Sequence, residues 1–386
     1  MGALTLTNLI PTIYAAMDTV SREQAGFVRA VAMDSNASRA ALGQSVLSPV
    51  VGAMAAEDLV ASNVAADTPA QTIGNVSISI SKSRSVPFGV TGEETMGLNT
   101  AGTLATVNRD RIAQAMRTLT NEIELDLANL FVGASRAIGT AAGTPFGTAG
   151  NLADFAAARR MMSENGAPSG ELRMVLGATN VERIRGVQAG LFRVNEAGTD
   201  ELLREGNIGR VQGFALGESA QVRTAVAIGA GTSYTSSSAA FTVGQVDIPV
   251  ITGSGAIIAG DIITFANDPN QYVVRTGITA ASQTLVLQQP GLRVAQGVAT
   301  RAITSVAATT RSMFFHRGAI QLLMRAPAMP EGGDMAEDVM SMVDPFSGLT
   351  FEFAIYRGKR QIRYEVNAAW GVAVVQPRHL GLLISA

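Results

Sequence analysis

The chain has 386 residues, of which 47% are hydrophobic and 16% are charged, and its formal net charge is −2. This length exceeds the roughly 250–300 residues that one hydrophobic core organises, so we expect two or three modules, or one domain with insertions. The near-neutral charge argues against a protein that coats nucleic acid, the absence of cysteine excludes disulfides and thiol chemistry, and two histidines leave little for a histidine-based metal site. So few charges on a long chain suggest that much of its surface faces other protein.

The first 70 residues are expected to form helices joined by loose connections. Ser21-x-x-Gln24 matches a capping box and precedes an apolar face from Phe27 to Val31. Residues 40–68 are alanine-rich without a firm period. Two interpretations stay open, a long arm with little core of its own and an N-terminal helical subdomain.

Targeting segments are not evident. No Lys or Arg precedes Arg22, and no apolar run approaches the roughly 20 residues of a membrane span. We therefore expect no signal peptide and no membrane segment, and a soluble protein made in a cytoplasm.

Residues 74–98 change to a period of two. Apolar residues alternate with serine from Val76 to Ile80, which predicts a half-buried strand. A polar turn over 82–85 and a second strand from Phe88 would complete a long β-hairpin. Because an isolated hairpin is marginally stable in water, it needs a surface to lie on.

The clearest helix is expected over 108–131, because one apolar stripe recurs there at three- and four-residue steps. At 1.5 Å per residue such a helix spans on the order of 35 Å. Three acids, Glu122, Glu124 and Asp126, are interpreted as lying opposite the stripe, on a solvated or inter-subunit face. The stripe consists of Ile112, Ala115, Met116, Leu119, Ile123, Leu127, Leu130 and Phe131.

Helix and strand then alternate up to residue 218. We expect a helix over 152–162, a strand over 172–176, a short helix opened by the capping box Thr179-x-x-Glu182, and a strand over 208–216.

Residues 221–310 are different in kind, since they contain no methionine and few charges and are rich in Thr, Ser, Gly, Val and Ile. Short β-type runs separated by Gly and Pro breaks predict a small all-β sandwich or barrel. We interpret it as an inserted module, because mixed composition resumes after it. A strand-like segment at 313–324, a loop at 327–345 and strands over 349–384 complete the chain. The expected short strands of the module are Phe241–Val243, Ile262–Phe265, Tyr272–Arg275 and Thr284–Leu287.

Motifs for catalysis or cofactor binding are absent. The phosphate-binding loop and the Gly-x-Ser-x-Gly elbow do not occur. His316 and His379 each stand alone in a strand-like context and are expected to be structural. The acids near the 327–345 loop lack the spacing of a calcium loop. We therefore expect no catalytic, cofactor-binding or metal-binding residue and no cofactor, and predict that the chain is not an enzyme. The acids concerned are Glu331, Asp334, Glu337, Asp338 and Asp344.

The order of elements resembles the major capsid proteins of tailed bacteriophages, which share the Hong Kong 97-type fold. The segment 204–216 is similar to the family's Gly-x-x-x-Gly-aromatic-x-Val strand, 314–325 to its return strand, and Val372–Val375 with Leu380–Ile384 to its closing strand. The module at 221–310 resembles the insertion domain of coat proteins from Salmonella-type short-tailed phages. The fold class implied is α+β with an inserted all-β barrel-like domain.

The resemblance implies a division into five parts. These are an N-terminal arm (1–73), an extended E-loop hairpin (74–98), a P-domain (99–150) with the spine helix 108–131 and completed by segments near 311–366, an A-domain (151–220 and 367–386), and the inserted β-domain (221–310).

The resemblance also implies a function. The chain would self-assemble through hexamers and pentamers into an icosahedral capsid shell around a double-stranded DNA genome, which it contacts non-specifically. Implied partners are a scaffolding protein, a portal and a possible decoration protein, with no membrane. The chain would be assembled in the bacterial host cytoplasm and located in the virion.

Some family members lock the shell by Lys–Asn isopeptide bonds from the E-loop. Lys82 lies in the hairpin expected here, but we interpret it as a solvated or salt-bridging residue and expect no crosslink. Three other functions remain as alternatives: an encapsulin-type compartment shell, a secreted β-rich surface protein, and a carboxylate-based hydrolase.

Overall fold

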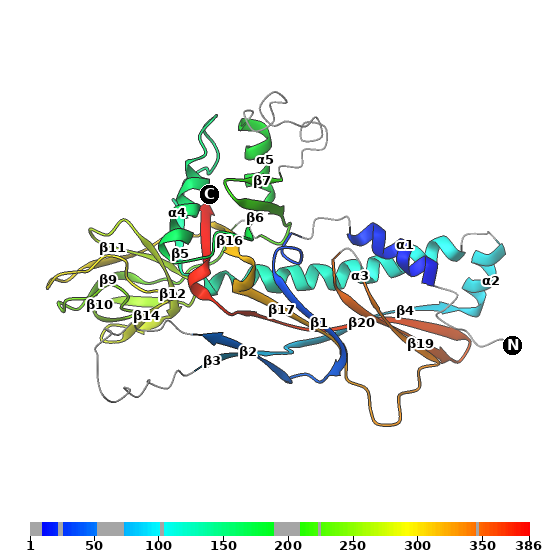
Figure 1. Ribbon diagram of the computed structural model, residues 1–386. Coiled ribbons are helices and arrows are strands. Elements are labelled where there is room, and N and C mark those ends of the chain that lie inside the picture. Colours follow the sequence, from blue (N-terminus) through cyan, green and yellow to red (C-terminus); the bar gives the residue numbers. More distant parts are fainter. Residues whose placement is uncertain are drawn as a thin grey trace, which may run out of the picture.

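Figure 1 shows the computed structural model, which describes residues 10–21, 26–51, 73–100, 104–188, 209–222, 225–344 and 347–386. A long helix, α3 (Leu104–Ala128), crosses the molecule and continues as the 3-10 turn η2 (Asn129–Gly133). It confirms the helix expected over 108–131. Most of its apolar stripe, including Ile112, Met116 and Ile123, is buried, while Leu130 and Phe131 in η2 are partly buried.

A six-stranded sheet packs against α3. Its order is β1-β17-β20-β19-β18, and β4 pairs with the other edge of the long strand β20. Trp370 and Met324 contribute to the core shared with α3, while their neighbours Ala369 and Leu323 face the opposite side. The strands are β1 (Ala32–Ala40), β4 (Lys82–Thr91), β17 (Ile320–Pro327), β18 (Asp338–Val343), β19 (Thr350–Gly358) and β20 (Gln361–Val374).

A second sheet forms the region around α4 (Ala153–Glu164) and α5 (Ala178–Val187), with the strand order β5-β21-β16-β6-β8-β7. Both helices pack into one apolar cluster that includes Phe155 and Ile184. The helix expected over 152–162 and the strand over 172–176 are confirmed. The strands are β5 (Arg136–Gly139), β6 (Leu172–Leu176), β7 (Arg210–Val211), β8 (Phe214–Glu218), β16 (Thr310–His316) and β21 (Leu380–Ser385).

Two details of that region differ from expectation. The strand expected over 208–216 is a tight hairpin, because Gln212 and Gly213 both adopt positive φ, 47° and 90°. The N-cap of α5 is Gly177, without a side-chain cap, so the capping box at Thr179 is wrong. Residues 204–208 lie outside the described residues.

The β-module is built from seven strands with an apolar core of their own, which includes Tyr234, Phe265 and Leu285. It continues the second sheet, since β12 pairs with β5. The expected strands at 262–265 and 284–287 are confirmed, and 272–275 lies within β12. Phe241 forms only an isolated bridge with Gln296, so the strand expected at 241–243 is wrong. The strands are β9 (Thr232–Ser236), β10 (Asp247–Ile257), β11 (Ile262–Phe265), β12 (Gln271–Thr276), β13 (Ile278–Ala280), β14 (Thr284–Leu287) and β15 (Ala302–Ser305).

The hairpin expected over 74–98 is wrong. β3 (Ile73–Ser79) pairs along seven residues with β2 (Ser45–Val51), whereas β4 pairs with β20 from Gln361 to Trp370. Alternation marks a residue as part of a strand but does not identify the partner strand. The two-stranded β2–β3 sheet, here called the ribbon, therefore takes the place of the hairpin.

The ribbon is anchored at its base. Ile78 and Ile80 are buried against Leu323, on the sheet face that α3 does not cover. A Cβ atom on Gly371 would lie 2.0 Å from the carbonyl oxygen of Ser79, so only glycine allows the chain to pass this close to β20.

The N-terminal segments also differ from expectation. α1 (Ile10–Ser21) ends at Ser21, and residues 26–30 form a turn rather than a helix. Ile13 and Phe27 are fully buried in the core around α3. The described residues before 52 are therefore not a purely helical subdomain, and several of their apolar side chains pack in the core around α3. The loop expected over 327–345 is also partly wrong, because β18 lies within it.

Because most of its buried apolar side chains form a core cluster of their own, with only Ile262 and Val273 of its strands in the core around α3, we predict that a fragment comprising residues 221–310 folds alone. Circular dichroism of the fragment should show β structure and a cooperative thermal transition. A fragment that lacks structure would show that pairing with β5 is required.

Candidate functional site

Clusters that could hold a metal do not occur among the described residues, where no three His, Asp or Glu side chains come together suitably. No helix in these ranges is long and apolar enough to cross a bilayer. The acids around the β17–β18 loop are held individually. Asp334 accepts a hydrogen bond from the Tyr356 hydroxyl at 2.6 Å, and Glu337 pairs with Arg357. The hydrogen bond from Tyr356 is the main cause of a lowered pKa of Asp334.

The two histidines, each expected to stand alone, are brought together. Their rings lie 6.3 Å apart, between the short 3-10 turns η4 (Arg317–Ala319) and η5 (Pro377–His379). His316 Nδ1 accepts a hydrogen bond from the backbone of Gly318 at 3.2 Å, a capping contact. Burial, followed by the charges of His316 and Arg378, lowers the pKa of His379. The expectation that each histidine stands alone is therefore wrong.

Glu124 does not lie on a solvated or inter-subunit face, as the sequence led us to expect. Its side chain is buried, and its carboxylate accepts hydrogen bonds from the backbone of Phe27 (3.1 Å) and Val28 (2.8 Å) and from the hydroxyl of Ser219 (2.8 Å). Burial raises the pKa of Glu124, and these hydrogen bonds oppose that shift. One carboxylate thus joins α3 to the N-terminal turn and to the end of β8.

Glu122 and Asp126 form a second contact around Lys82. The Lys82 ammonium lies 2.8 Å from Asp126 and 3.0 Å from Glu122, and the indole N–H of Trp370 donates to Asp126 at 2.8 Å. Burial lowers the pKa of Lys82, but Asp126 and Glu122 outweigh it, so the net shift is upward. Lys82 is therefore a protonated, salt-bridging residue, and a protonated amine is not a nucleophile.

Three exposed features of the described chain are not covered by its other described parts. The first is the ribbon, on which Leu47 is 61% exposed. Side chains on one of its faces are half-buried and those on the other are open to solvent. A two-stranded ribbon gains its stability from a surface that it lies on.

The second feature is α2 (Gly92–Thr100), a helix in which no side chain is buried. It is held by a reciprocal capping box, in which Thr91 N–H donates to Glu94 at 2.9 Å and Glu94 N–H donates to the Thr91 hydroxyl at 3.2 Å. Met96 is 75% exposed. A nine-residue helix is marginal in water without packing, so α2 is suited to being covered by another molecule.

The third feature is the loop between β17 and β18. Met335 is 93% exposed, although Asp334 and Glu337 on either side of it are fixed by Tyr356 and Arg357. The loop projects from the six-stranded sheet (Figure 1) and carries the exposed Met335 between two fixed acids.

The chain is similar to known proteins in its structure but not in its sequence. No protein-family model matches the sequence, and no curated protein matches it. The structure is similar to a chain in the capsid structure of the cyanophage P-SCSP1u, with a TM-score of 0.50 and 10% identity over 94% of this chain and 89% of that chain. Further matches are a chain from Mycobacterium phage Che8 (TM-score 0.47, 14% identity, 88% and 84% covered) and the virus-like particle from Pyrococcus furiosus (TM-score 0.43, 10% identity, 97% and 98% covered). The cyanophage match shows that this chain has a capsid-protein fold of mixed α and β structure.

Replacing Glu124 by Gln should destabilise the fold by about 1–3 kcal/mol, because the amide nitrogen cannot accept the hydrogen bonds that the carboxylate accepts. Denaturant unfolding measures the loss. Glu93→Gln, at an exposed position of α2, is the matched control and should leave stability unchanged.

The same substitution removes a pH dependence. A folded-state pKa above the ordinary 4.5 means that folding favours the protonated form of Glu124. The contribution of Glu124 is therefore largest below 4.5 and falls as the pH rises through the raised pKa. The stability difference between the wild type and Glu124→Gln should narrow over this range, and a constant difference would contradict the burial of the carboxylate.

Proposed function

We propose that the chain is the structural subunit of an icosahedral capsid shell that encloses a double-stranded DNA genome. The observation that carries the proposal is the capsid-protein fold, which extends over 94% of the chain. The exposed ribbon, α2 and the Met335 loop supply surfaces for contacts between copies. A shell subunit needs such surfaces to be complementary and to close.

We assign the parts of the chain to domains as the resemblance implies, with one change. The ribbon, instead of residues 74–98, serves as the extended loop that lies on the next subunit. α3 and the six-stranded sheet correspond to the P-domain, and the sheet with α4 and α5 corresponds to the A-domain. The β-module corresponds to the inserted domain of the short-tailed phage type. A separate apolar core supports that assignment.

The function does not require an active site. Many shallow contacts per copy multiply into a stable container. Scaffolding, portal and decoration proteins are proposed partners on the ground of the resemblance, and DNA is contacted non-specifically. A net charge of −2 supports containment of DNA rather than tight binding. Assembly would take place in the bacterial host cytoplasm, and the assembled location would be the virion.

An encapsulin-type compartment is the second candidate, because a shell that encloses protein cargo poses the same physical problem. Electron microscopy of the purified protein tests both. Closed icosahedral particles support a shell subunit, and co-purification with a portal and DNA, rather than with a cargo enzyme, supports the capsid. A protein that stays monomeric at high concentration would contradict both.

The ribbon is best tested by substitution. Deleting residues 76–94 would also remove β4, which pairs with ten residues of β20, and would therefore damage the fold. Leu47→Asp places a charge on an exposed position and should leave the thermal transition of the monomer unchanged while abolishing particles. Val298→Asp, at an exposed apolar position of the β-module, is the control and should assemble. Normal particles from Leu47→Asp would contradict the role of the ribbon.

The shell is predicted to contain no covalent crosslink through Lys82, since that amine is engaged by Asp126 and Glu122. Assembled particles run on a denaturing gel should give only the band of the single chain. Ladders of multimers that disappear in Lys82→Arg would overturn this prediction.

A further inference from the structure

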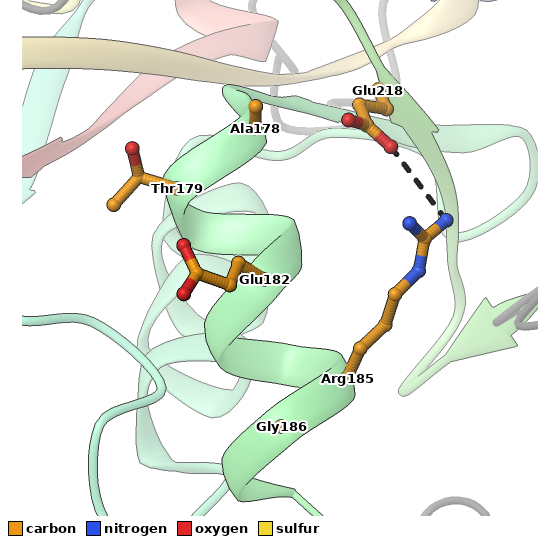
Figure 2. Close-up of a pocket in the computed structure, with 6 residues that line it drawn as sticks. All are labelled: Ala178, Thr179, Glu182, Arg185, Gly186 and Glu218. Atoms are coloured by element: carbon orange, nitrogen blue, oxygen red, sulfur yellow. Dashed lines mark ion pairs between the residues drawn. The ribbon is translucent and has the colours of Figure 1, made fainter.

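An open groove of about 630 Å³ runs along the solvent-facing side of α5. The other side of the helix is buried through Val181 and Ile184. Figure 2 shows Thr179 and Glu182 projecting to one side of α5, while Arg185 projects to the other side toward Glu218. The groove is lined by Ala178, Thr179, Glu182, Arg185, Gly186 and Glu218.

The charges in this groove are not balanced. Arg185 and Glu218 form an ion pair at 3.6 Å. Glu182 is exposed and forms no ion pair with any residue in the described ranges. The groove therefore offers a carboxylate that can accept a cation from outside.

The groove is also shaped for close approach. A Cβ atom added to Gly186 would meet nothing within 4 Å, and Ala178 is small and exposed. A second helix can lie close to α5 here, because small residues allow two helix axes to approach.

α4 carries the complementary surface. Its inner side is buried through Phe155 and Met162, and its outer side carries small residues together with Arg160 and Glu164. The Arg160 side chain is 72% exposed, and its ion pair with Glu164 is long, at 3.7 Å. Glu164 is already engaged by Arg136 at 2.8 Å, so Arg160 can turn to another carboxylate. The outer residues are Ala153, Ala156, Arg160, Ser163 and Glu164.

The two helices have matching lengths, 12 residues for α4 and 10 for α5, which correspond to about 18 Å and 15 Å. They cover the same face of one sheet. α4 lies beside β5 and β21, and α5 follows β6, nearer the other edge. Figure 1 shows them side by side. A neighbouring copy related by rotation can therefore present its α4 to the groove on α5, which is a head-to-tail contact of the kind that closes into rings.

We propose that the α5 groove binds α4 of a second copy of this chain, with Arg160 of one copy paired with Glu182 of the next. This inference rests on the proposed shell function and identifies one contact within a ring of subunits. The small residues of both helices allow the close approach, and the pairing of Arg160 with Glu182 fixes the register.

Charge reversal tests the pairing. Glu182→Arg and Arg160→Glu should each abolish assembly, because like charges would then meet across the contact, and the double variant should restore it. Sedimentation velocity and electron microscopy measure rings and particles. Asp247→Arg and Arg275→Glu make the same charge changes at exposed positions of the β-module and should assemble as the wild type does. Single reversals that assemble normally, or a double variant that stays blocked, would overturn the proposal.

A second variant separates packing from folding. A Cβ atom at Gly186 has open space, and leucine favours a helix over glycine. Gly186→Leu should therefore fill the groove and leave the thermal transition unchanged or higher while assembly is lost. If the wild type and all these variants form shells, the groove proposal fails and the shell function stands. If the wild type forms rings that depend on Glu182 but never shells, the shell function fails and the groove stands. A wild type that stays monomeric overturns both.

Discussion

The arrangement of the chain depends on three acids within five residues of α3. Removing a carboxylate from water is costly unless its oxygens are hydrogen-bonded, and the buried Glu124 meets that condition with two backbone N–H groups and one hydroxyl. Its donors come from residues 27, 28 and 219, which are far apart in the sequence. Glu122 and Asp126 add Lys82 and Trp370. One stretch of helix thereby fixes the N-terminal turn, the end of β8, the start of β4 and the middle of β20.

Buried charged side chains with hydrogen-bond partners also hold the junction between the β-module and the rest of the chain. Arg136 on β5 is buried and donates to Asn270 of the module at 3.0 Å and to Glu164 of α4 at 2.8 Å. Arg311 donates to the carbonyl of Gly260 at 2.6 Å and lies 4.7 Å from the Phe131 ring centroid. Burial lowers the pKa of Arg311. Hydrogen bonds from Arg136 and Arg311 therefore orient the module, and Ile262 and Val273 of the module pack in the core around α3.

The local sequence pattern was enough to predict the elements that are marked by a periodic apolar stripe or by a short apolar run. The stripe of α3, the strand 172–176 and three of the four expected β runs of the module lie where the sequence places them. The partners of strands were not predictable in the same way, because alternation in β3 and β4 is equally compatible with a hairpin and with the observed pairing to β2 and β20. The burial of Glu124 did have a sequence signal. Each helical residue advances by about 100°, so Glu124 lies beside Ile123 on the flank of the stripe and not opposite to it.

The low charge of the chain takes on a more specific meaning in the structure. The exposed apolar side chains Leu47, Met96 and Met335 lie on elements that are ordered without being buried. α2 is ordered by its capping box, and the Met335 loop is ordered by Tyr356 and Arg357. An element that is already rigid loses little conformational entropy when a partner covers it, so more of the contact energy remains for binding. The contact surfaces are therefore ordered before a partner binds. Association of many identical copies through small contacts requires this property.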